Sequence, residues 1–129
     1  MKKLPILLFS ILISFNSYGE WTQISSNLKG DFYFIDHETI KEQNGYIYYW
    51  GLDDLNLPIK GTPVVSSKIR MQVDCSEEKM RMIVIYYYQK QMGKGGVYMA
   101  DESPGKTWKY PPPGTPYYRL LNYACDYLG

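Results

Sequence analysis

The chain has 129 residues, of which 45% are hydrophobic and 21% charged. This is an ordinary globular composition with room for one domain, and no second domain is needed. Without Lys2 and Lys3, 12 of the 14 basic residues remain against 13 acidic ones, a formal charge of −1. A balance this close to neutral argues against general nucleic-acid or acidic-membrane binding.

The N-terminus has the layout of a secretory signal peptide. Lys2 and Lys3 precede an apolar run of roughly ten residues, too short for a permanent bilayer anchor, and small residues follow at Ser17 and Gly19. We expect a signal at 1–19, cleaved after Gly19, and a domain at 20–129; an uncleaved N-terminal anchor is the alternative. No cysteine lies near the cut, so the sequence predicts a periplasmic or secreted protein that is not a lipoprotein and is not stably inserted in the membrane.

The first half of the domain alternates short strands with turns. The Asn-Gly pair at Asn44 indicates a tight hairpin. Asp36 is a suitable cap for a single helical turn. The sequence predicts, in order, a strand at 20–24, a turn at 27–31, a strand at 32–35, the helical turn at 37–40, a turn at 43–45 and an aromatic strand at 46–50.

The clearest strand signal is the strict polar and apolar alternation from Lys68 to Cys75. It predicts a half-buried strand whose inner row is Ile69, Met71, Val73 and Cys75. An irregular crossing at 53–65 precedes it, and a turn at 76–79 leads into a fifth strand at 80–88. An even turn would place Cys75 opposite Met80, Asp74 opposite Arg81 and Lys68 opposite Tyr87.

The C-terminal part ends in a helix. A glycine-rich turn at 92–96, a short strand at 97–100 and a stiff Pro111–Pro113 segment come first. Thr115 is a suitable N-cap and Pro116 a suitable first helical residue. One apolar stripe then follows at helical spacing. Its members are Tyr117, Leu120, Leu121, Ala124, Cys125 and Leu128.

The two cysteines, Cys75 and Cys125, are expected to pair. Disulfides are usual in exported chains, and the strand and helix periodicities each place a cysteine on the inner face. Closing a loop of about 50 residues contributes on the order of 4 kcal/mol. Metal binding is a weak alternative, because two cysteines and the lone His37 do not form a zinc ligand set; we expect no cofactor.

Candidates for catalysis are few. A nucleophilic site would depend on His37, which the pattern places in a solvated turn. The paired carboxylates at 53–54, 77–78 and 101–102 fall in predicted turns, where solvated loop charge is the default. A small hydrolase is therefore the least favoured function.

One helix covers one face of a sheet, which leaves the other face to be explained. The expected register places there Lys68, Arg70, Gln72, Asp74, Arg81, Ile83, Ile85 and Tyr87. Three apolar or aromatic residues in one row among basic ones favour a contact with a protein partner or a second copy of the chain. The candidate contact face is Lys68, Arg70, Arg81, Ile83, Ile85 and Tyr87; an ordinary half-exposed face is the alternative.

Several motifs in sequence order resemble one known family. They are Trp21, Tyr33-Phe34-Ile35-Asp36 with Ile40, Trp50 with Leu52, Ser67-Lys68, Asp74-Cys75, Met92-Gly93-Lys94-Gly95, Trp108, Pro113-Gly114-Thr115 and Cys125. Over almost the whole domain the chain is similar to the bacterial surface-adhesin protein E family.

The resemblance implies a single antiparallel sheet of about six strands, with a C-terminal helix held to one face by the disulfide. It also implies a non-enzymatic envelope protein, an adhesin for host matrix or plasma proteins. The naming adhesin is a lipoprotein, whereas no cysteine is placed to carry a lipid here. A soluble periplasmic accessory protein in envelope assembly or stress tolerance is therefore the alternative.

Overall fold

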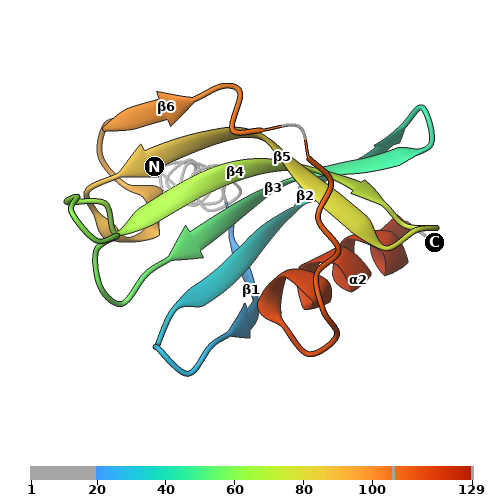
Figure 1. Cartoon of the computed structure of the whole chain (residues 1–129), viewed down its shortest axis with the longest axis horizontal. Coiled ribbons are helices and arrows are strands. Elements are labelled where there is room, and N and C mark those ends of the chain that lie inside the picture. The colour runs from blue at the N-terminus through green and yellow to red at the C-terminus, as the bar shows by residue number, and fades with distance from the viewer. Residues whose placement is uncertain (1–19, 106, 129) are drawn as a thin grey trace, which may run out of the picture.

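The computed structural model describes residues 20–105 and 107–128, so the expected signal at 1–19 lies outside the described residues. The described chain forms one six-stranded antiparallel sheet in sequence order, with a helix on one face (Figure 1). The predicted α+β fold class is confirmed. The strands are β1 (Thr22–Ser26), β2 (Phe32–Gln43), β3 (Tyr46–Asp54), β4 (Ser66–Asp74), β5 (Lys79–Tyr88) and β6 (Met99–Asp101); the helical elements are η1 (Gln91–Gly93) and α2 (Pro116–Leu128).

Helix α2 begins as its sequence predicts, and its predicted apolar stripe packs on the core except at Leu128, which is 48% exposed. The Thr115 hydroxyl accepts the backbone N–H of Tyr118, 3.4 Å away, which is the bond of an N-cap, and Pro116 is the first helical residue. The apolar stripe points Leu120, Leu121 and Ala124 into the core against β1 and β2. The inner row of β4 lies in the same core, with Ile69, Met71 and Val73 all buried. The inner face of the sheet is thus the side that α2 covers.

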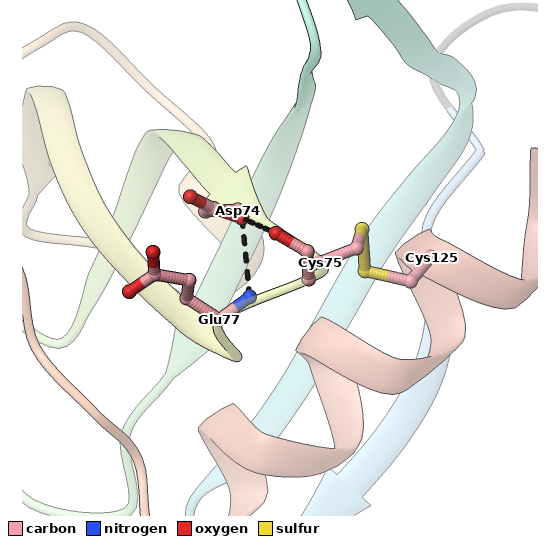
Figure 2. Close-up of a disulfide and its surroundings, with 5 residues drawn as sticks. Asp74, Cys75, Glu77 and Cys125 are labelled. Carbon is pink, nitrogen blue, oxygen red and sulfur yellow. Dashed lines mark hydrogen bonds between the residues drawn. A yellow bond between two sulfur atoms is a disulfide. The ribbon is translucent and has the colours of Figure 1, made fainter.

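Cys75 and Cys125 form the predicted disulfide, with their Cα atoms 5.9 Å apart (Figure 2). The side chain of Asp74 fixes the turn that presents Cys75. Its Oδ1 accepts the Ser76 hydroxyl at 2.8 Å and the Glu77 N–H at 3.2 Å. Because α2 packs mainly on β1 and β2, the bridge extends the attachment of the helix to the end of β4.

The predicted helical turn at 37–40 is wrong. β2 continues through these residues as a bulged strand, with its pairing to β3 interrupted between Asp36 and Lys41. The Thr39 hydroxyl fills the gap, since it accepts the N–H of Trp50 at 3.0 Å and donates to the Asp36 carbonyl at 2.6 Å. The side chain of Asp36 does accept a local N–H, that of Glu38, but within a bulge instead of a helical turn.

The predicted register between β4 and β5 is also wrong. The turn has the expected even length, four residues, but it begins at Cys75, so Asp74 lies opposite Lys79 and Gln72 opposite Arg81. The Asx-type bonds of Asp74 explain the early reversal. A bulge in β5 then shifts the pairing, and beyond it Arg70 lies opposite Val84.

The bulge changes which residues of β5 face the core. An extra residue in one strand reverses the alternation beyond it. Ile85 therefore lies opposite Ile69 on the inner face with 7% of its surface exposed, and Tyr87 packs against the same core. Val84 and Tyr86 take the outer positions.

Candidate protein-contact face

The outer face of β3, β4 and β5 carries rings and cations side by side. Alternation puts the even-numbered residues of β3 and β4 on this side, because the odd-numbered ones face the hydrophobic core. β5 adds two cations, Lys79 and Arg81, before its bulge and the ring of Tyr86 beyond it, and the segment after β6 adds Trp108. We call this surface the cation–aromatic face: Tyr46, Tyr48, Trp50, Lys68, Arg70, Lys79, Arg81, Tyr86 and Trp108.

Arg70 is the centre of the cation–aromatic face. Its guanidinium carbon lies 5.6 Å from the ring centroid of Tyr48 and 5.7 Å from that of Trp50. The ring of Trp50 in turn stacks on Tyr86, with centroids 5.9 Å apart and planes 11° from parallel. Guanidinium groups bind aromatic faces through the ring quadrupole, so these contacts hold the long Arg70 side chain in place.

A second group is built around Trp108. The Arg81 guanidinium carbon lies 4.4 Å from its ring centroid and the Lys79 ammonium 4.9 Å, while Tyr46 packs at 5.6 Å. Backbone pairing between Lys109 and Met80 places the tryptophan beside β5.

Buried Gln72 connects the two groups. Its amide oxygen accepts the Nε–H of Arg81 at 2.7 Å, and its amide nitrogen donates to the Tyr48 hydroxyl at 3.0 Å. The cation–aromatic face is therefore one linked, pre-organised layer.

The structure places the six predicted contact residues in three positions. Lys68, Arg70 and Arg81 lie on the outer face, as expected. Ile83 is in the bulge and 36% exposed. Placing Ile85 and Tyr87 on this face was wrong, because the bulge turns both side chains inward.

All five aromatic members of this face were absent from the sequence-based set. Tyr46, Tyr48 and Trp50 could have been found from the alternation within the predicted strand at 46–50. Tyr86 could not have been found. The run from Met82 to Tyr88 is apolar or aromatic throughout, so its pattern does not indicate which of its residues face the core. Trp108 reaches the face only through a bridge to β5.

The candidate catalytic residues do not form a site. His37 lies in the bulge of β2, where Nδ1 is 3.3 Å from the Thr22 hydroxyl and the ring packs on Tyr127. Among residues 20–105 and 107–128, no three His, Cys, Asp or Glu side chains gather into a metal-binding group. A cleft of about 560 Å³ beside β5 is lined by methionines, prolines, Arg81, Lys109 and other residues, none of them a histidine or a carboxylate.

The prediction of turns for the paired carboxylates is wrong at 53–54, which end β3, and at Asp101, which ends β6. Asp54 accepts the backbone N–H of Met92 at 2.7 Å. Asp53 lies on the inner face, buried beneath α2, and accepts a hydrogen bond from the Tyr117 hydroxyl. Burial raises the pKa of the Asp53 carboxyl to about 7; the bond from Tyr117 opposes this shift and the charge of Asp31 adds to it. Burial likewise raises the pKa of the neighbouring Tyr49. This carboxyl is covered by the helix, so its role is in packing.

Within the described residues, no helix is long and apolar enough to cross a bilayer. The family model of the surface-adhesin protein E matches residues 21–126. The chain belongs to the surface-adhesin protein E family. Solved structures agree in fold. Crystal form II of Haemophilus influenzae protein E superposes with a TM-score of 0.62 at 16% identity, covering 84% of this chain and 90% of that one.

A second structure of Haemophilus influenzae protein E gives a TM-score of 0.60 at 16% identity, over 82% of this chain and 83% of that one. No curated protein sequence matches this member of the family. At such low identity the likeness to the solved structures establishes the fold alone, so the contact residues have to be argued from this chain.

Proposed function

We propose that this protein is an exported, non-enzymatic binding protein of the bacterial cell envelope, an adhesin for host matrix or plasma proteins. Membership of the adhesin family supports the class, and the cation–aromatic face supports the site. Tyr, Trp and Arg are the residues enriched at binding hot spots, because rigid rings and planar guanidinium groups give contact area at little entropic cost.

The chemistry of this face defines the partner. Arg70 and Arg81 already lie against rings, so a partner carboxylate would meet guanidinium groups whose orientation is fixed before binding. Acidic and aromatic side chains of a partner protein are the complementary groups. A second copy of the chain, paired face to face, is the homodimeric alternative; it would offer rings to the arginines but would also bring the cations of the two faces together.

The test is a double substitution, Trp50→Ala with Arg70→Ala. The matched control, Arg119→Ala with Tyr127→Ala, removes an exposed cation and an exposed ring from α2 on the other side of the sheet. Binding to immobilised matrix and plasma proteins should fall more than tenfold for the first pair only. Sedimentation velocity reports self-association of the same samples. Wild-type behaviour of the first pair in both assays would exclude this face.

One observation favours a second candidate, a periplasmic accessory protein without host contact. Both cysteines of the sequence are in the disulfide, so neither thiol is available for a lipid. Fractionation separates the candidates: antibody labelling of intact cells supports the adhesin, whereas release only by osmotic shock supports the periplasmic protein.

A further inference from the structure

Three connections meet at one end of the sheet, opposite the disulfide. They are the β1–β2 turn (27–31), the β3–β4 connection (55–65) and the β5–β6 connection (89–98), and antiparallel order brings every second connection to the same end. In Figure 1 all three lie at the left of the view. We call these residues the loop end.

Hydrogen bonds join the three connections into one platform. The backbone N–H of Asn56 donates to Asp31 at 2.9 Å, and its side-chain amide donates to the Lys29 carbonyl at 3.0 Å. On the other side, Gln91 donates to the Leu55 carbonyl at 2.7 Å. Each connection is therefore bonded to its neighbour on the sheet.

Each connection exposes a large aliphatic side chain. Leu28 in the first is 108% exposed, Leu57 in the second 73% and Val97 in the third 51%. A single exposed leucine is unremarkable in a soluble protein. Here three exposed aliphatic side chains, one from each linked connection, lie at the same end of the sheet.

The same connections carry an excess of positive charge. Four exposed lysines lie in them, namely Lys29, Lys60, Lys90 and Lys94. The acidic residue within these three ranges is Asp31, and both of its oxygens accept hydrogen bonds, from Asn27 and Asn56. Asp54, at the end of β3, also meets these connections, because it accepts the backbone N–H of Met92 at 2.7 Å. At the other end of the sheet, exposed Glu42, Glu77 and Glu78 are accompanied by exposed Lys41 and Lys109. The loop end thus has a local excess of positive charge within a chain of near-neutral total charge.

We propose that the loop end binds the surface of an anionic phospholipid bilayer. The lysines would lie among the lipid phosphates, and Leu28, Leu57 and Val97 would enter the headgroup region, the arrangement by which peripheral proteins attach to membranes. This attachment is peripheral and needs no spanning segment.

The composition of the loop end favours a lipid surface over a protein partner. Protein interfaces are depleted in lysine and enriched in Tyr, Trp and Arg, and rings and arginines form most of the cation–aromatic face. At the loop end all four cations are lysines, and the exposed large apolar side chains beside them are mainly aliphatic, with Tyr98 as the one exposed ring within these ranges. Binding by the strand ends would leave the outer face of the sheet accessible, so this inference goes beyond the proposed function and stands independently of it.

Vesicle co-sedimentation of the exported protein tests the proposal. Vesicles of phosphatidylglycerol and phosphatidylethanolamine should bind the protein, pure phosphatidylcholine vesicles should bind it at least tenfold less, and 1 M salt should release it. Equal binding to both vesicle types, or to neither, would overturn the proposal.

Substitutions locate the binding surface. Lys60→Gln with Lys94→Gln should lower partition into anionic vesicles about 25-fold, whereas the control Lys41→Gln with Lys109→Gln, exposed lysines far from the loop end, should not. Leu28→Ser with Leu57→Ser should lower it about tenfold, and Leu128→Ser, 48% exposed on α2, should leave it unchanged. All these side chains are exposed, so each variant should keep the wild-type melting temperature.

Equal losses in test and control pairs would refute the assignment to the loop end. So would a loss of matrix-protein binding with vesicle binding intact, since it would identify a protein as the occupant. Conversely, variants of Trp50 and Arg70 should bind vesicles normally, which separates failure of this proposal from failure of the proposed function.

Discussion

The two faces of the sheet use the same kinds of residue for different purposes. On the inner face Tyr49 is fully buried, and its hydroxyl has no hydrogen-bond partner among the described residues. Its neighbour Tyr48 points the other way, where its hydroxyl accepts from Gln72 and its ring meets Arg70. Tyr49 therefore fills space in the core, whereas Tyr48 is part of the outer surface. Stability should therefore depend on the inner face and binding on the outer one.

Removing the disulfide should have the largest effect on the inner side. Cys75→Ala with Cys125→Ala opens a loop spanning a separation of 50 residues. The free energy of unfolding should fall by about 4 kcal/mol, mainly because the unfolded chain gains freedom. Urea denaturation at pH 7 measures this, with reduced wild-type protein as the control. A loss below about 1 kcal/mol would mean that packing alone holds α2.

A core truncation should come next. Leu121→Ala leaves a cavity between α2 and the sheet, and the expected loss is about 3 kcal/mol. The matched outer substitution, Val84→Ala, removes two methyl groups from a half-buried position and should cost about 1 kcal/mol. Chemical denaturation of both variants compares the faces directly. Similar losses of unfolding free energy in the two variants would contradict the prediction that stability depends mainly on the inner face.

Burial of the Asp53 carboxyl should make the stability of the fold depend on pH. The pKa of Asp53 rises from 3.8 to about 7 on folding, so between those values the unfolded chain has released a proton that the folded chain keeps. Unfolding therefore releases a proton, and stability falls as pH rises from about 4 to 7. Asp53→Asn should flatten this part of the curve. Thermal unfolding across the range is the measurement, and an unchanged slope would show that another group is responsible.

On the outer face the smallest change in stability should accompany the largest change in binding. Arg70→Ala removes two ring contacts worth about 1 kcal/mol together at a half-exposed site. The melting temperature should fall by only a few degrees, while affinity for the protein partner should fall at least tenfold. Arg70→Lys keeps the charge but not the planar group, and should recover only part of the affinity. Full recovery would show that charge alone matters.

Short-range patterns predicted much of the fold. The alternation in β4 and the helical stripe of α2 each depend on a few neighbouring residues, so together they predicted the disulfide even though the register of the next hairpin was wrong. The turn beginning at Cys75 depends on two hydrogen bonds accepted by the side chain of Asp74. The alternation of polar and apolar residues in a strand does not predict such bonds.

The remainder depended on contacts distant in sequence. Asp53 follows an aromatic strand and precedes a second aspartate, a typical loop pattern, and its burial requires Tyr117, 64 residues later. The outer face was predicted as a region, with Lys68, Arg70 and Arg81 in place. Its ring composition was missed, because the bulge in β5 lies in a run of apolar residues that fit either face equally well.

The β5 bulge also affects how relatives of this chain should be compared. One inserted residue exchanges the inner and outer side chains over the rest of a strand. A homologue without the bulge would therefore have Ile85 and Tyr87 on the outer face and Tyr86 on the inner face. At 16% identity an alignment can slip by one position in such an apolar run. Positions in Haemophilus influenzae protein E should therefore be matched to this chain by the direction of each side chain and not by alignment column.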